Sequence, residues 1–137
     1  MPTQELHDEF SRLYAIIKKL RSEDGCPWDL RQTPASIKKY LLEEAAELAE
    51  AIDHVDAPHI REEIGDLFYI LILLMRMHEE KGEFSAIDVF ATISEKMIRR
   101  HPHVFAGART GTDSELHAQW EKIKARERKS KGRNGDE

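Results

Sequence analysis

Apolar residues recur at helical spacing along most of the chain, and this periodicity constrains the fold more than any other feature. The first such stretch contains Leu6, Phe10, Leu13, Ile17 and Leu20. Residues spaced three or four apart share one face of a helix, and an apolar face has to be buried against other elements. No segment shows the period-two alternation that is typical of a half-buried strand. The sequence therefore predicts an all-α protein.

Capping and turn residues divide the chain into five predicted helices within one domain, residues 1–129. Thr33 and Asp56 are typical N-caps because each precedes an apolar periodic stretch, and Gly82 is typical of a helix end. The helices are expected at residues 6–20, 34–54, 57–81, 86–100 and 113–129, with a loop at 25–33 and a flexible tail at 130–137.

Composition and charge exclude several classes of protein. The chain has 137 residues, of which 40% are apolar and 34% charged, which fits one soluble helical domain. The formal net charge of −5 argues against a general nucleic-acid binder. Cys26 is the single cysteine, so no disulfide can form within the chain. The N-terminal stretch lacks an apolar signal region. We expect a cytoplasmic protein that binds neither nucleic acid nor membranes.

The longest apolar run extends from Leu67 to Met75 and is apolar on all sides of its predicted helix. Nine residues are too few to span a bilayer. A small domain has difficulty burying every face of one helix within a single subunit, so the run predicts a subunit interface. We therefore expect a homodimer or a higher oligomer, and the alternative is a helix at the centre of the core.

Acidic residues are concentrated between residues 41 and 66, which hold nine acids and one base. Glu44 and Glu47 lie three apart on one predicted helix, and Glu63 and Asp66 lie three apart on the next. A short connection makes these helices antiparallel neighbours. Glu47 and Glu63 are each eight residues from Val55, while Glu44 and Asp66 are each eleven away. Both pairs should therefore stand level, at roughly 12 and 16 Å from the turn.

Four ionised carboxylates in one place repel one another, and a divalent cation would remove that conflict. All-oxygen ligands favour hard ions, so Mg²⁺ is the first candidate and Mn²⁺ the second. Glu43 lies beside the cluster and could hold a second ion or a water. The alternative is that these acids form a solvated helix face without a ligand.

Four segments of the chain resemble the MazG-type nucleoside triphosphate pyrophosphohydrolases. They are GCPWDLRQT, YLLEEAAELAEAID, REEIGDLFYILI and EKMIRRHPHVF. The pattern E-E-x-x-E followed by E-x-x-D is typical of that family, and here it consists of Glu43, Glu44, Glu47, Glu63 and Asp66. The likeness runs from about Leu20 to Lys129 and contains one such pattern, whereas many members carry two such domains in tandem.

The resemblance implies a four-helix MazG-like bundle with an additional C-terminal helix, working as a dimer. Its reaction is Mg²⁺-dependent hydrolysis of a nucleoside triphosphate to the monophosphate and pyrophosphate, in the service of nucleotide-pool house-cleaning. The implied metal ligands are Glu44, Glu47, Glu63 and Asp66. The implied catalytic carboxylates are Glu43, Glu44 and Glu47, and the implied substrate-binding residues are Lys96, Arg99, Arg100 and Trp120. In the predicted mechanism, a water oriented by Glu43 or Glu44 attacks the α-phosphorus, and pyrophosphate leaves toward the basic residues.

Two alternative functions remain open at this point. The same scaffold could act on dUTP, dCTP or phosphoribosyl-ATP, because periodicity does not reveal the shape of the base and sugar pocket. The other alternative is a non-catalytic helical interaction module. Trp28 is a further candidate, either to stack on a nucleobase or to plug the end of the bundle.

Overall fold

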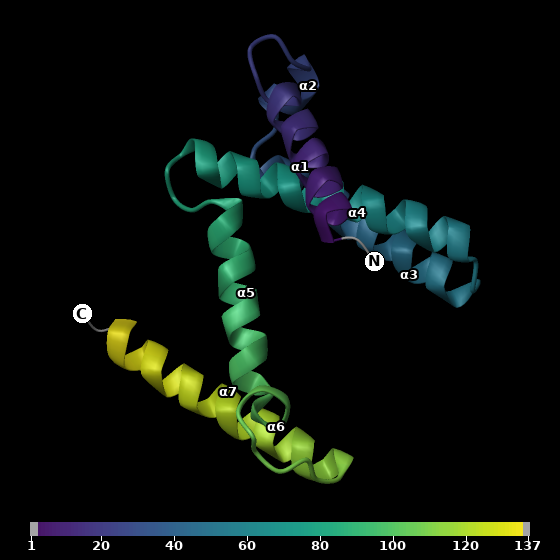
Figure 1. Cartoon of the computed structure of the whole chain (residues 1–137). Coiled ribbons are helices and arrows are strands. Elements are labelled where there is room, and N and C mark those ends of the chain that lie inside the picture. Colours follow the sequence, from purple (N-terminus) through teal and green to yellow (C-terminus); the bar gives the residue numbers. More distant parts are fainter. Residues whose placement is uncertain (1–2, 136–137) are drawn as a thin grey trace. The chain divides into compact units, whose positions relative to one another are not determined.

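The computed structural model describes residues 3–135, with side chains described for residues 3–131. Every regular element in this range is a helix, which confirms the predicted all-α class. The helices are Thr3–Leu20 (α1), Pro27–Arg31 (α2), Pro34–Asp53 (α3), Ala57–Glu80 (α4), Ala86–Arg100 (α5), Pro102–Phe105 (α6) and Asp113–Gly135 (α7), coloured along the chain in Figure 1.

The chain divides into two compact units, residues 1–86 and 87–137. The first unit contains α1 to α4, and the second contains α6, α7 and all of α5 except its first residue. Among residues 3–135, no helix combines the length and the apolar character that crossing a membrane requires.

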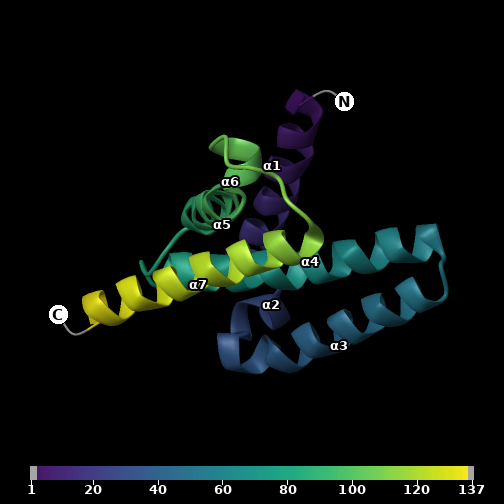
Figure 2. The ribbon, with the colours of Figure 1, turned by 90° about the horizontal axis from the view of Figure 1, so that it is seen from below.

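The predicted caps of α3 and α4 are confirmed. The Thr33 hydroxyl accepts a hydrogen bond from the Ser36 N–H at 3.1 Å, and the Ser36 hydroxyl accepts one from the Thr33 N–H at 2.8 Å. Asp56 accepts a hydrogen bond from the His59 N–H at 3.3 Å. Between the two helices Val55 adopts a left-handed conformation, with φ of 52°. This tight turn makes α3 and α4 antiparallel neighbours, which lie side by side in Figures 1 and 2.

The core of the first unit is built around α4, which packs against both α1 and α3. Its buried members come from three helices and are Ile17, Ile37, Ile70, Ile72, Leu73 and Met77. Most of the apolar run from Leu67 to Met75 is therefore used inside the unit, as the central-helix alternative requires. Phe68 is an exception because it remains 43% exposed. The predicted subunit interface stays a prediction.

The segment 25–33 was predicted to be a loop, and this is wrong for its central part, which forms α2. A helix of five residues is too short to show apolar periodicity. It is held by a tertiary contact instead, because the Arg21 guanidinium donates to the carbonyls of Asp29, Leu30 and Gln32 at 2.7, 3.1 and 2.9 Å. These carbonyls lie at the end of α2, where intrahelical partners are missing.

The second unit differs from prediction at two places. The four-residue helix α6 is too short to have been recognised from periodicity, and it begins at Pro102, a favoured first helical residue. The last helix was predicted to end at 129, which is wrong, because α7 continues to Gly135. An isolated glycine such as Gly132 costs a helix only about 1 kcal/mol, so it does not have to end one. Flexibility of the tail stays a prediction, and residues 136–137 lie outside the described residues.

Candidate functional site

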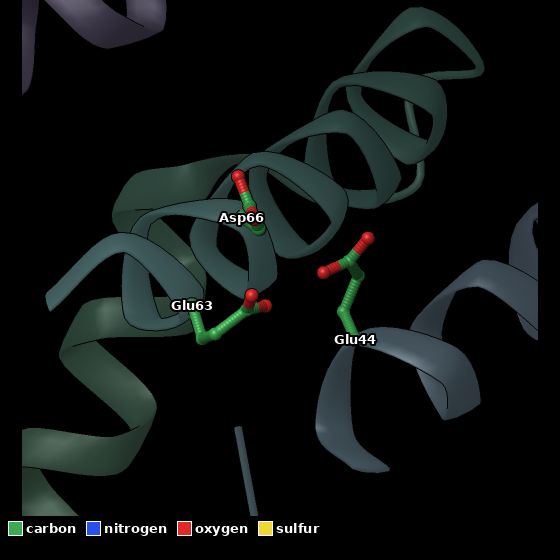
Figure 3. Close-up of side chains that lie close together, drawn as sticks. All are labelled: Glu44, Glu63 and Asp66. Atoms are coloured by element: carbon green, nitrogen blue, oxygen red, sulfur yellow. The ribbon is translucent and has the colours of Figure 1, made fainter. Parts of the chain in front are cut away.

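The α3–α4 hairpin brings three of the predicted carboxylates together. One oxygen atom each of Glu44, Glu63 and Asp66 lies within 4.8 Å of the others. Figure 3 shows Glu44 projecting from α3 toward Glu63 and Asp66 on α4. The three side chains meet because their residues stand at matching heights on either side of the turn at Val55. These three residues are called the carboxylate cluster below.

The carboxylate cluster is partly buried, and some of its oxygen atoms have no hydrogen-bond partner among the described residues. Glu63 is only 7% exposed, Glu44 is half-buried, and Asp66 is exposed. Glu44 Oε2 and Glu63 Oε2 are both buried and have no hydrogen-bond partner among the described residues. Burial and repulsion from Glu47 and Asp66 raise the pKa of Glu44 to about 7. The pKa of Glu63 is also raised, mainly by burial and then by repulsion from Glu47.

These observations fit a divalent cation. A buried carboxylate oxygen without a partner loses hydration that only a donor or a cation can replace, and two residues of the cluster each have such an atom. All of the ligands are oxygen atoms, which suits a hard ion such as Mg²⁺. Glu44, Glu63 and Asp66 are therefore able to hold a metal, and a divalent ion would offset two of the three negative charges that they carry when ionised.

Two predicted residues lie beside the carboxylate cluster and not within it. Glu47 is exposed, yet it is close enough to raise the pKa values of both Glu44 and Glu63. Glu43 is also exposed and does not belong to the cluster. The predicted roles of Glu47 as a ligand and of Glu43 as an assisting carboxylate stay predictions.

His59 contacts the carboxylate cluster and was not predicted to do so. Its Nε2 atom lies 3.1 Å from Glu63 Oε1, across one turn of α4. This hydrogen bond acts to lower the pKa of Glu63, against the larger effect of burial. The spacing of four residues between His59 and Glu63 was the signal in the sequence that could have identified the pair.

In the second unit, two of the predicted phosphate-binding residues are paired with a carboxylate. Arg99 Nε lies 2.7 Å from Glu127 Oε1, and Arg100 Nη2 lies 2.7 Å from Glu127 Oε2. The hydrogen bond from Arg100 is the main reason that the pKa of Glu127 is lowered to about 2. No local pattern predicts a pair 27 or 28 residues apart, so Glu127 was missed. Lys96 is half-buried on the same helix, and its role stays a prediction.

Trp120 lies in a cavity next to these arginines. The Arg100 guanidinium is 5.1 Å from the centre of the Trp120 ring, and the His101 ring lies 5.2 Å away at a steep angle. The cavity has a volume of about 390 Å³ and is lined by Arg100, His101, His103, Leu116, His117 and Trp120. A flat aromatic wall beside a cation is suited to a stacked ring and an anionic group. Trp28, the other candidate, packs edge-on against Tyr40 with ring centres 5.5 Å apart.

Comparison with known proteins decides the family. Residues 32–105 match the sequence profile of the MazG nucleotide pyrophosphohydrolase domain. The chain belongs to the MazG family. The matched residues include every predicted metal ligand together with Lys96, Arg99 and Arg100, whereas Trp120 and Glu127 lie beyond them.

Several curated relatives of this MazG domain are named for an activity. The nucleoside triphosphate pyrophosphohydrolase of Escherichia coli K12 is 43% identical over 128 residues, which are 93% of this chain and 49% of that protein. The nucleoside triphosphate pyrophosphohydrolase/pyrophosphatase MazG of Thermotoga maritima is 45% identical over 122 residues, which are 89% of this chain and 46% of that protein. The uncharacterised protein YabN of Bacillus subtilis is 46% identical, with 90% of this chain and 25% of that protein covered. The chain thus spans between a quarter and a half of these three relatives.

The fold has a counterpart among solved structures. The crystal structure of a mazG-related protein from Thermotoga maritima superimposes with a TM-score of 0.70 and 28% sequence identity. The match covers 84% of this chain and 98% of that protein. An all-helical MazG fold is therefore shared between the two chains.

Proposed function

We propose that this MazG domain hydrolyses a nucleoside triphosphate to the nucleoside monophosphate and pyrophosphate in a reaction that depends on a divalent cation. The observation that carries the proposal is the pair of buried, unpartnered oxygens, Glu44 Oε2 and Glu63 Oε2, at the carboxylate cluster. The names of the relatives from Escherichia coli and Thermotoga maritima support the same activity.

Glu44, Glu47, Glu63 and Asp66 are the proposed metal ligands, with Mg²⁺ as the cofactor and Mn²⁺ as its substitute. A divalent ion bound there would offset the charge of the phosphate oxygens and lower the pKa of a bound water. A triphosphate carries about four negative charges, so it would not approach these acids without a cation.

The chain itself supplies the base in this proposal. Water attacks the α-phosphorus, its proton passes to a carboxylate, and the bond from phosphorus to the bridging oxygen of the β-phosphate breaks to release pyrophosphate. A carboxylate that ligates a cation is a weaker base, because the positive charge lowers its pKa. Glu43 lies outside the carboxylate cluster, so Glu43 is a better candidate for the base than Glu44.

Lys96, Arg99 and Arg100 share one face of α5, since they stand at i, i+3 and i+4. They are the proposed ligands of the phosphate groups, and Trp120 is the proposed contact of the nucleobase. Glu127 accepts hydrogen bonds from Arg99 Nε and from Arg100 Nε and Nη2, so a phosphate bound by these nitrogens would have to share or displace that carboxylate. The cavity of about 390 Å³ beside Trp120 is large enough for a nucleobase.

The proposed assembly is a homodimer, or a higher oligomer, of four-helix bundles that each carry an additional C-terminal helix. An apolar groove of about 310 Å³ between α3 and α4 supports an interface on the first unit. Its lining includes Ile37, Leu41, Leu71 and Leu74. A house-cleaning role, a cytoplasmic location and the absence of nucleic-acid and membrane partners remain predictions from the sequence.

One assay tests the activity directly. Release of pyrophosphate and of monophosphate is measured for ribo-, deoxyribo- and damaged nucleoside triphosphates, with and without Mg²⁺. The panel includes dUTP, dCTP and phosphoribosyl-ATP, which represent the alternative substrate classes. We expect equal amounts of the two products, and only with the cation. Release of inorganic phosphate in place of pyrophosphate, or no products at all, would contradict the proposal.

Matched variants connect that activity to the carboxylate cluster. Glu63→Gln keeps the side-chain size and removes the charge, so it should abolish both turnover and thermal stabilisation by Mg²⁺. Glu50→Gln is the control, because Glu50 is an exposed carboxylate on α3 outside the cluster. A non-catalytic interaction module would respond to neither substitution.

A further inference from the structure

His59 occupies a defined place at the start of α4. Its backbone N–H donates a hydrogen bond to the capping Asp56, and its side chain extends along the helix to Glu63. The ring is 44% exposed, whereas the Glu63 side chain that it contacts is 10% exposed. The histidine thus lies at the boundary between solvent and the buried end of the carboxylate cluster.

The two oxygens of Glu63 are in different situations. Oε1 forms a hydrogen bond with His59 Nε2 at 3.1 Å, while Oε2 is buried and has no hydrogen-bond partner among the described residues. A carboxylate with one anchored oxygen cannot rotate freely about its last bond. The anchored atom therefore fixes which oxygen is presented to Glu44 and Asp66.

We infer that His59 is a positioning residue for the metal site: its Nε2–H donates to Glu63 Oε1 and thereby holds Glu63 Oε2 ready for the cation. This inference rests on the proposed function, because it takes Glu63 to be a metal ligand. Hydrogen bonds from such outer residues orient ligating carboxylates, and losing one typically weakens metal binding by about 10- to 100-fold.

The geometry favours a donor over a direct ligand. Among the described residues, the ligand atoms that lie within 4.8 Å of one another belong to three carboxylates. No nitrogen of His59 belongs to this group. The Nε2 atom is already engaged with Glu63. Hard cations also prefer oxygen to imidazole nitrogen.

Two amide substitutions distinguish the effect of losing the hydrogen bond to Glu63 from the effect of losing the imidazole ring. In His59→Gln the amide nitrogen takes nearly the position of Nε2 and can still donate to Glu63. In His59→Asn the amide nitrogen takes the position of Nδ1 and cannot reach. His59→Ala removes the donor entirely, and His7→Ala is the control because His7 is an exposed histidine on α1.

Mg²⁺ affinity is measured by calorimetric titration of the whole chain, without substrate. We expect His59→Ala and His59→Asn to bind Mg²⁺ about tenfold more weakly than the wild type or worse. His59→Gln and His7→Ala should bind it nearly as tightly as the wild type. Equal affinity of the Gln and Asn variants would overturn the inference, even if the Ala variant failed to fold.

The same titration distinguishes a failure of the inferred role of His59 from a failure of the proposed function. If the wild type does not bind Mg²⁺ or Mn²⁺ at all, the proposed function fails together with the inference. If the wild type binds the cation and Glu63→Gln does not, while every His59 variant binds it normally, only the role of His59 is wrong.

Discussion

Arg100 holds the carboxylate of Glu127 with two of its nitrogens, Nη2 at 2.7 Å and Nε at 3.2 Å from the same oxygen. Both side chains are largely buried, at 15% and 13% exposure. The cation proposed to bind phosphate is therefore already neutralised by a carboxylate of its own chain. A carboxylate and a phosphate present similar oxygens to a guanidinium, so Glu127 is placed to compete with the substrate.

Glu127→Gln should tighten substrate binding while weakening the fold. Removing the charge releases Arg99 and Arg100 for phosphate, so we expect KM for the triphosphate to fall several-fold. It also leaves the largely buried Arg100 guanidinium with a weaker partner, so the midpoint temperature of unfolding should fall. Steady-state kinetics and thermal unfolding measure the two effects on one protein.

The control for this substitution is Glu121→Gln on the same helix. Glu121 is exposed, pairs with Lys124 at 3.8 Å and acts on Arg100 more weakly than Glu127 does, so both KM and stability should stay near the wild-type values. A Glu127→Gln protein that is less stable but has an unchanged KM would show that Arg100 has a structural role and does not bind phosphate.

The difference between Glu44 and Glu127 shows what could be predicted from this sequence. Glu44 was placed near Asp66 by counting residues from Val55, because two helices joined by a short turn have a fixed register. The caps at Thr33 and Asp56 depend on neighbouring residues and were predicted for the same reason. Local geometry thus determines the hairpin and the carboxylate cluster.

Features that depend on distant contacts could not be predicted in this way. The helix α2 depends on Arg21, a residue of the preceding segment, and the pair of Arg100 with Glu127 joins two separate helices. Periodicity contains no information about which polar side chains meet across such distances. His59 is an intermediate case, since its spacing to Glu63 was visible in the sequence but the burial of Glu63 in the cluster was not.

Phe68 provides a test of the proposed dimer. It lies in the apolar run of α4 yet remains 43% exposed, so a partner subunit is the expected cover. Phe68→Glu would place a charge in that interface and should produce monomers. Light scattering after size-exclusion chromatography is expected to give twice the chain mass of 15.9 kDa for the wild type and that mass for the variant.

Leu6→Glu is the control for the dimer test, because Leu6 is 62% exposed on a different helix, α1. It should leave the mass unchanged. A wild-type protein with the mass of one chain would refute the dimer, and a Phe68→Glu protein with the mass of two chains would exclude Phe68 from the interface.

Val55 provides a test of the turn that sets the register of the carboxylate cluster. A β-branched residue at φ of 52° is strained by about 1–2 kcal/mol, and Val55 is 85% exposed, so no packing offsets the strain. Val55→Asn should raise the free energy of unfolding by about 1 kcal/mol, since asparagine tolerates this conformation. Thermal unfolding should show a gain of about 3 °C.

The same change at Val104, an exposed residue of helix α6, is the control and should bring no gain. Mg²⁺ affinity should be equal in the wild type and in Val55→Asn, because the backbone path of the turn is retained. If Val55→Asn is no more stable than the wild type, the strain assigned to this residue is wrong.

The raised pKa of Glu44 predicts how the free energy of unfolding depends on pH when no metal is bound. Its carboxyl has an ordinary pKa of 4.5 in the unfolded chain and a pKa of about 7 in the folded one. Between these values the folded protein binds more protons than the unfolded chain, so the free energy of unfolding falls as pH rises. Thermal unfolding of the metal-free wild type and of Glu44→Gln across this window measures the effect. The difference between the two curves measures the effect of the Glu44 charge, including its repulsion with Glu47, Asp66 and Glu63.

Mg²⁺ should offset that loss of stability at higher pH, because a bound cation favours the ionised form of the Glu44 carboxylate. At a concentration about one hundred times its Kd, the ion should add about 2.7 kcal/mol to the wild type. The gain should increase with pH through the same window, since protons and the cation compete for the same oxygens. It should be small in Glu44→Gln and normal in Glu50→Gln. A gain in the wild type that does not change with pH would mean that Glu44 is not a ligand, and that the ion binds elsewhere.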